Sequence, residues 1–227
     1  MNYDWRFGRL VPYAEAFLSG TLTAISLAVI SIVLGTLLGV ALGLAMRRPL
    51  VSKFMYPAVD IVRALPPLVL LLFLYYLLTE QVIGITVSAY WVAVSALSLN
   101  LAAFTSDLVR SGIESVPRSS MDAGRALSMS SSQLTRYIVL PHVFRETLPT
   151  MTLLYIGVLK MTSLASIINV RETVYAAQTV IADISRSLEA WVVVGLIYVV
   201  LVVPSTYGTR MVERWAHRGR APNQSSV

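Results

Sequence analysis

Three long stretches of this chain carry no charged side chain, and they limit its possible folds more than any other feature. They cover residues 16–46, 81–106 and 190–209 of a chain of 227 residues. A helix needs about 20 apolar residues to cross the roughly 30 Å hydrocarbon core of a bilayer. Each stretch is long enough, so the sequence predicts an all-α integral membrane protein.

The composition excludes several other classes of protein. Hydrophobic residues make up 56% of the chain and charged residues 13%, whereas globular proteins have about 25% charged residues. The net charge of +6 is scattered between the apolar stretches, so we expect no nucleic-acid partner. There is no cysteine, which excludes disulfides and cysteine metal sites. The first apolar run is too long for a cleaved signal peptide, so we expect it to remain.

Hydropathy and chain breakers together predict about five transmembrane helices. We place them at about residues 17–46, 54–78, 87–109, 148–170 and 190–211, followed by a polar tail at 214–227. Gly35, Gly39 and Gly43 recur every four residues in the first helix. They either form a smooth face for another helix or reflect the general abundance of glycine in membrane helices.

The distribution of lysine and arginine predicts the orientation, because cytoplasmic segments are enriched in both. Twelve of these residues lie in the segments on one side and four on the other. The richer side holds the segment 116–149 and the C-terminus. The N-terminus is therefore expected outside and the C-terminus in the cytoplasm, which requires an odd number of spans.

The polar segment 116–149 reads like soluble protein between two spans. Ser119 and Asp122 have the spacing of a capping box at a helix start, and we expect the run from Ser130 to Ser132 to end that helix and cap the next. Small side chains would let a partner approach closely, and Asp122 and Arg125 offer charged contacts. The alternative is a plain amphipathic loop.

The order of residues in this segment resembles the "EAA" loop of ABC importer permeases. It runs Asp122-Ala123-Gly124, then Ser128, then Ile138-Val139-Leu140-Pro141. In that family the loop is a short cytoplasmic helix pair seated in a groove of the ATPase subunit. Asp122, Gly124 and Ser128 replace the family's usual Glu, Ala and Gly. The resemblance implies a coupling loop at about 116–146, with ATPase contacts at Asp122, Ala123, Gly124, Arg125, Ser128 and Pro141.

Three further segments are similar to permeases for polar amino acids of the His, Glu, Gln, Arg and opine type. They are residues 104–129, 62–68 (Val-Arg-Ala-Leu-Pro-Pro-Leu) and 160–164 (Lys-Met-Thr-Ser-Leu). The resemblance implies a type I ABC importer permease fold over residues 1–213, in the bacterial inner membrane. It also implies import by alternating access with these partners: ABC ATPase subunits, a second permease (identical or paralogous), an extracytoplasmic substrate-binding protein and membrane lipid.

The chain has no residues for catalysis or for a cofactor of its own. It lacks the Gly-x-x-x-x-Gly-Lys-Ser/Thr phosphate-binding motif, so ATP is expected on a partner subunit. The two histidines, His142 and His217, are too far apart in sequence to suggest a metal site. We expect His142 to be a loop residue at the partner surface.

The candidate substrate residues lie in the second and fourth spans. Charges within a membrane helix are costly and point to function, so Lys160 would hold a substrate carboxylate. The alternatives are that it snorkels to the membrane surface or pairs with an acid such as Asp107. Two neighbouring hydroxyls would either bind the ligand or bond back to the preceding turn. Proline at the break in the second span would free carbonyls toward a cavity. The predicted substrate-binding residues are Lys160, Thr162, Ser163, Leu65 and Pro66.

The remaining predictions concern one position that lacks an expected acid and two pairs of charged residues. Met161 stands where the resembling family commonly has an acid. This argues either against a cationic amino acid as substrate or against this chain holding the whole site, in which case a second, different permease would supply the acid. Asp60 and Arg63 are three residues apart and should pair on one helical face. Glu172 and Arg186, on the outer side, would meet a binding protein, close an outer gate or simply be solvated.

Two other functions remain open at this point. An ion-coupled secondary transporter of small zwitterions would show inverted repeats and deep acids, and no such repeat is visible, while Asp60 and Asp107 both lie toward the predicted cytoplasmic side. A scaffold or receptor subunit without transport is the second alternative, and the intramembrane Lys160 argues against it.

Overall fold

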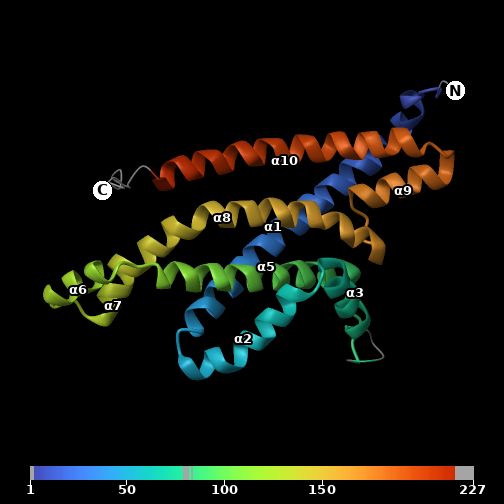
Figure 1. The fold of residues 1–227 in the computed structure, drawn as a ribbon. Helices are drawn as coiled ribbons and strands as arrows, with labels where there is room; N and C mark the ends of the chain where they lie inside the picture. The colour runs from blue at the N-terminus through green and yellow to red at the C-terminus, as the bar shows by residue number, and fades with distance from the viewer. Residues whose placement is uncertain (1–2, 79–81, 83, 218–227) are drawn as a thin grey trace.

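The structure, a computed structural model, describes residues 3–78, 82 and 84–217, and these residues are almost entirely helical (Figure 1). The 3-10 helices are η1 (Phe7–Tyr13) and η3 (Thr162–Ile168), and η2 (Thr135–Val139) is a π-helix. The α-helices are α1 (Ala14–Ala45), α2 (Pro49–Ala64), α3 (Pro67–Leu77), α5 (Ala89–Glu114), α6 (Arg118–Ala126), α7 (Ser131–Leu134), α8 (Leu140–Met161), α9 (Thr173–Ile184) and α10 (Ser187–His217).

The described residues include four helical segments that are long and apolar enough to cross a membrane. They are Phe7–Ala45, Ala89–Glu114, Ser131–Ile168 and Ser187–Thr209. A fifth crossing is present if the bent pair Pro49–Ala64 and Pro67–Leu77 counts as one span. The predicted all-α membrane fold is therefore confirmed. Residues 218–227 of the predicted tail, and residues 79–81 and 83 near the junction of the second and third predicted spans, lie outside the described residues.

The long helices lie side by side, and their ends define two faces of the bundle (Figure 1). Helices α6 and α7 gather at one end, which we call the α6 end. The N-terminus and α9 lie at the opposite end, which we call the α9 end. Helix α1 packs against α5, and α8 packs against both α5 and α10. A single bundle thus separates the polar segment 116–149 from the N-terminal segment.

The contact between α1 and α5 depends on the glycines of α1. A Cβ atom added to Gly39 would lie 2.5 Å from Cβ of Thr105, and one added to Gly35 would lie 2.8 Å from the carbonyl oxygen of Ser98. Real Cβ atoms do not approach other atoms so closely, so only glycine allows this separation. The glycine repeat therefore forms the smooth face that the sequence predicted, and its spacing is more than a reflection of membrane composition.

Two breaks differ from the prediction. The second span bends by 110° between α2 and α3, far more than a kink, because Pro66 and Pro67 lack donors and hold Leu65 in extended conformation. The fourth span begins earlier than predicted, because α7, η2 and α8 form one helical segment from Ser131 to Ile168. The second half of the polar segment is thus helical and continuous with the helix of the fourth span.

Candidate functional site

The polar segment folds into a helical hairpin, which we define as residues 118–139 and call the α6 hairpin. The predicted capping box at Ser119 is wrong: the N-cap of α6 is Pro117, two residues earlier, and it makes no side-chain cap. Proline suits this place because the first amide groups of a helix have no intrahelical partner. The second predicted cap is confirmed, since Ser130 and Gln133 form a reciprocal capping box at the start of α7.

Ser128 turns the chain between the two helices of the hairpin. Its backbone φ is 56°, in the left-handed region, and its amide donates to the carbonyl of Arg125 at 2.9 Å. The amide of Met129 donates to the carbonyl of Gly124 at 3.1 Å. This pair of bonds is the Schellman motif, which prefers glycine at the left-handed position. The conformation explains why the EAA pattern carries glycine where this chain has serine.

The exposed side of α6 differs in part from the predicted docking side. Gly124 is buried, and a Cβ there would lie 2.5 Å from Cδ2 of Leu134. Its small size therefore serves packing within the hairpin and leaves no surface for a partner. Asp122 and Arg125 form an exposed ion pair at 3.1 Å, and Ala123 is exposed. Leu127 is 78% exposed, an apolar side chain at the tip that the sequence analysis missed.

Pro141 and His142 lie in the first turn of α8, at the base of the hairpin. His142 was predicted to be a loop residue, but it is helical and its Nε2 lies 3.1 Å from Oγ of Ser115. Pro141 is exposed and directly follows the π-helical turn η2. Because proline has no amide hydrogen and its ring crowds the carbonyl four residues earlier, a widened turn fits at this point.

Lys160 does not pair with Asp107. The carboxylate of Asp107 is shared by Arg63 at 3.4 Å and Arg110 at 3.5 Å. Arg63 also pairs with Asp60 at 3.5 Å, as predicted. Lys160 lies in the last turn of α8 and makes no ion pair within the described part of the chain. Its ammonium group therefore has no carboxylate partner among the residues that the structure describes.

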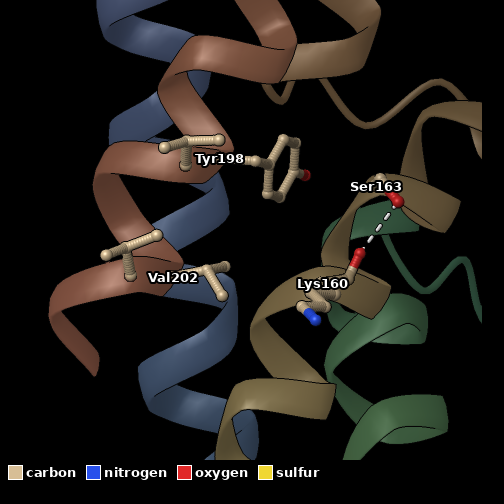
Figure 2. A pocket seen from close by; sticks show the side chains of 6 residues that line it. Lys160, Ser163, Tyr198 and Val202 are labelled. Carbon is tan, nitrogen blue, oxygen red and sulfur yellow. Dashed lines mark hydrogen bonds between the residues drawn. The ribbon is translucent and has the colours of Figure 1, made fainter. Parts of the chain in front are cut away.

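A groove of about 360 Å³ lies between α8 and α10 beside Lys160, and we call it the Lys160 groove (Figure 2). Tyr198 extends from α10 toward Ser163, on the far side of the gap. The Tyr198 hydroxyl, which the sequence analysis missed, adds a hydrogen-bonding group in an otherwise apolar wall. The groove is lined by Lys160, Ser163, Tyr198, Val199, Val202 and Val203.

The two predicted hydroxyls both bond back to the main chain. Thr162 donates to the carbonyl of Leu159 at 2.8 Å, and Ser163 donates to the carbonyl of Lys160 at 2.9 Å. Of the two interpretations offered by the sequence, the structure shows the backbone bond. Ser163 still faces the groove, while Thr162 is fully buried with its Oγ1 3.5 Å from the Tyr198 hydroxyl.

Leu65 and Pro66 lie apart from the Lys160 groove, at the break between α2 and α3. The next residue, Pro67, lines a separate cavity of about 200 Å³ between α3, α5 and α8. Its other walls include Asn100, Phe104, Gly157 and Met161. Asn100 is a buried amide in an apolar helix, a signal that was visible in the sequence and not used. The predicted substrate residues thus divide between two places.

Glu172 is fully buried, so the prediction of a solvated charge is wrong. Its Oε1 accepts hydrogen bonds from the amides of Val174 at 2.8 Å and Tyr175 at 3.0 Å, which caps α9. Its Oε2 is buried without a hydrogen-bond partner. Burial raises the pKa of this carboxyl to about 7, against the lowering effect of these amides and of the Tyr198 hydroxyl.

Arg186 is half-buried and helps to fix the N-terminal segment at the α9 end. It donates to the main-chain carbonyl of Asp4 at 2.9 Å and to the carboxylate of Glu189 at 3.3 Å. Glu189 is as buried as Glu172, but its oxygens also accept from the Tyr3 hydroxyl at 2.6 Å and the Arg6 amide at 3.1 Å. Of the two buried glutamates, only Glu172 has an oxygen left unpaired.

The described residues form a polytopic helical bundle with a protruding hairpin and grooves between its helices, an architecture that suits a membrane transport subunit. The family of binding-protein-dependent transport system inner membrane components matches residues 31–218. This chain belongs to that family. It is a multi-pass inner-membrane permease subunit of an ABC importer, and hydrolysis of ATP takes place on a separate subunit.

Curated relatives cover most of the chain. The octopine transport system permease protein OccM of Rhizobium radiobacter is 37% identical over 82% of this chain and 80% of its own length. The arginine transport system permease protein ArtQ of Bacillus subtilis is 30% identical over 94% of this chain and 97% of its own. The family works with ABC ATPase subunits and a substrate-binding protein.

Solved structures share the fold. The crystal structure of an amino acid ABC transporter with histidines matches with a TM-score of 0.85 at 25% identity, over 95% of this chain and 100% of that one. The inward-facing MetNI methionine ABC transporter matches with a TM-score of 0.74 at 18% identity, over 92% of this chain and 99% of that one. The predicted type I importer permease fold is confirmed, and the ion-coupled alternative gains no support.

Proposed function

We propose that this chain forms part of the pathway for a polar amino acid or an opine-type derivative. The single observation that carries the proposal is the ammonium group of Lys160, which has no carboxylate partner among the described residues and faces a groove of about 360 Å³. Ligand sites commonly have volumes of about 300–1,000 Å³ with a few placed polar groups. A free ammonium in an apolar wall suits the carboxylate that all these substrates carry. Relatives that transport octopine and arginine support this class.

We propose that the α6 hairpin docks onto the ATPase through its exposed side. Asp122, Ala123, Arg125 and Leu127 share that surface, while Ser128 and Pro141 shape it. A hairpin continuous with the fourth span would pass a rigid-body movement of the ATPase directly to Lys160, because α7, η2 and α8 form one helical segment. ATP itself would be bound by the ATPase subunit.

We propose that a second permease of different sequence completes the importer. The cavity between α3, α5 and α8 is lined by Gly157 and Met161 and by no carboxylate, so the ammonium group of a substrate has no counter-charge there. The outer face of α10, with Leu196, Val200 and Val203 exposed, is left for that partner or for lipid. The excess of lysine and arginine supports an N-terminus outside and a cytoplasmic C-terminus.

Two experiments test this function. The tagged chain is purified in mild detergent from its native membrane, and the co-purifying proteins are identified by mass spectrometry. We expect an ATPase and a related but different permease in stoichiometric amounts, and recovery of the chain alone after crosslinking would contradict the proposal. The assembled complex is then reconstituted with its binding protein and tested for ATP-dependent uptake of arginine, glutamine, octopine and nopaline. Uptake of none of the four would contradict the substrate class.

A further inference from the structure

Five side chains fasten α2 to α5 in a reciprocal arrangement that we call the Asp107 clasp. The guanidinium carbon of Arg63, on α2, lies 5.5 Å from the centre of the Phe104 ring on α5. In the opposite direction, the guanidinium carbon of Arg110, on α5, lies 5.0 Å from the centre of the Tyr56 ring on α2. Asp107 faces each arginine with one carboxylate oxygen, at 3.4 Å and 3.5 Å. Each helix thus contributes one cation and one aromatic ring, and a single acid serves both cations.

Helix α2 has few other attachments to the bundle. It lies at the edge of the bundle and packs chiefly on α5 (Figure 1). Apart from the clasp, Val59 of α2 and Ala103 of α5 share one small buried cluster. At its C-terminal end, α2 meets α3 at the 110° bend, where Pro66 and Pro67 have no amide hydrogen to donate to a preceding turn. Helix α2 is therefore an arm that ends at a break and is held on α5 by the clasp.

The clasp adjoins the cavity of about 200 Å³ between α3, α5 and α8. Phe104 belongs to both, because its ring lines the cavity and also contacts Arg63. Pro67, which begins α3 after the bend, lines the same cavity. Asp107 and Arg110 follow Phe104 along α5 by about one and two turns, toward the α6 end. A movement of α2 would take Arg63 away from the Phe104 ring and so release the wall of the cavity on that side.

The contacts of the clasp can be exchanged at low cost. Charge-assisted hydrogen bonds between a guanidinium and a carboxylate are usually about 2.7–2.9 Å long, whereas both contacts of Asp107 are longer. The side chains of Arg63, Asp107 and Arg110 are 29–33% exposed, so water can replace these partners. Among the described residues, the Nε atoms of the two arginines have no hydrogen-bond partner. Ion pairs of this kind contribute little to stability.

The helix that carries Asp107 leads directly to the α6 hairpin. Helix α5 ends at Glu114 and α6 begins at Arg118, so only three residues separate the clasp helix from the surface on which we place the ATPase. A rigid-body movement of the ATPase would therefore shift α5. Helix α2 would not follow by necessity, because the bend at Pro66 separates it from α3.

We propose that the Asp107 clasp is a gate between this cavity and the α6 end of the bundle. The gate is closed when α2 lies on α5, as in this structure, and opens when the two helices separate at the clasp. ATP would hold it closed, and loss of nucleotide would open it toward the ATPase side. The proposal rests on the function proposed above, because it takes the cavity as part of the substrate pathway.

The absence of cysteine from the chain allows a direct test. Gly157 lines the cavity, and a Cβ added there would meet no side-chain atom closer than Cε of Met161 at 4.0 Å, so Gly157→Cys places one thiol in the cavity. Inside-out membrane vesicles, in which the ATPase side faces the medium, are treated with a membrane-impermeant maleimide. With the clasp intact, a non-hydrolysable ATP analogue should slow the labelling of this thiol at least about tenfold.

Asp107→Asn and Asp60→Asn, each combined with Gly157→Cys, are the matched variants. Both acids face the guanidinium of Arg63, at 3.4 Å and 3.5 Å, but only Asp107 joins two helices. Asp107→Asn should be labelled at the fast rate with or without the analogue, and Asp60→Asn should keep the full difference. The proposal is overturned if Asp107→Asn also keeps the full difference, or if the thiol in the intact clasp is labelled in neither state.

Arg63→Lys decides the question if Asp107→Asn does not assemble with the ATPase. Lysine keeps a positive charge for Asp107 but lacks the planar fork that stacks on Phe104. Labelling with the analogue present should then be about threefold faster than with the intact clasp, and an equal rate would contradict the gate. Labelling requires no transported substrate, so it decides the gate even if none of the four substrates is taken up, an outcome that contradicts the proposed substrate class alone.

Discussion

The amide of Ser128 donates to the carbonyl of Arg125 at 2.9 Å while Ser128 holds a left-handed backbone with φ of 56°. This one relationship closes helix α6 and sets the angle at which the hairpin turns. A residue with a side chain is strained in that conformation, by about 1–2 kcal/mol for most amino acids.

Ser128→Gly should therefore stabilise the α6 hairpin by about 1 kcal/mol, and Ser128→Val should destabilise it by more than that. The effect arises at the turn itself, because glycine adopts the left-handed backbone conformation without a steric cost. Hydrogen exchange of the α6 amides in the purified importer measures the difference in hairpin stability between the wild type and the two variants. Equal protection in the glycine and valine variants would show that this turn does not limit the opening of the hairpin.

Gly39→Ala should destabilise the packing of α1 on α5 by about 1–3 kcal/mol. The new methyl group would lie 2.5 Å from Cβ of Thr105, so the two helices must move apart. Gly195→Ala is the matched control, because no atom lies within 4 Å of the added Cβ on α10. The midpoint of thermal unfolding, measured for each variant in detergent, compares their stabilities. A midpoint for Gly39→Ala equal to that of the control would contradict the close approach.

Asp122→Arg should uncouple ATP hydrolysis from transport without lowering the stability of the permease. The ion pair with Arg125 is exposed on both sides, and such pairs contribute about 0–1 kcal/mol to folding. Reversing the charge on the exposed side of α6 should lower the ATPase stimulation by the binding protein about tenfold. Lys53→Glu, which reverses an exposed charge on α2 outside the hairpin, should leave stimulation unchanged. Equal stimulation in the two variants would place the ATPase contact elsewhere.

Lys160→Met should raise the KM for uptake at least about tenfold, since an ammonium that pairs with the substrate carboxylate is lost. Lys53→Met removes an exposed lysine from α2 and should change KM little. Lys160→Arg should give an intermediate value, because it keeps the charge in a different shape. An unchanged KM in Lys160→Met would remove this groove from the substrate pathway.

The stability of the permease should fall as the pH rises from about 4.5 to about 7, because of Glu172. Its pKa is raised from 4.5 in the unfolded chain to about 7 in the folded protein, so the folded state holds the proton more tightly. The protonated carboxyl group stabilises the fold fully below the unfolded pKa of 4.5, and this contribution is lost as the pH rises through the folded pKa of about 7. The contribution to the free energy of unfolding is at most about 3 kcal/mol. Thermal midpoints of wild type and Glu172→Gln should diverge across this window. Parallel curves would contradict a raised pKa.

Much of the fold follows from local sequence, because its physical causes are local. A run such as residues 16–46, with no charge to place in lipid, must cross the membrane as a helix that satisfies its own backbone. Pro66 and Pro67 break a helix wherever they stand, and Ser130 caps one through a residue three positions away. The hairpin and the family were recognisable for the same reason, since the spacing from Asp122 to Pro141 lies within one short segment.

The tertiary structure decided which side chains meet, because contacts between distant segments leave no periodic signal in a single sequence. Asp107 was equally placed to pair with Lys160 or an arginine. The packing of α2 on α5 brought Arg63 to it, while Arg110 lies three residues further along α5. Glu172 looks in the sequence like any charge outside a span, but it is fully buried where α1 packs closely against the start of α9. Likewise, α2 and α3 pack on α5, whereas the Lys160 groove is lined by residues from Lys160 to Ser163 and from α10, so Leu65 lies away from that groove.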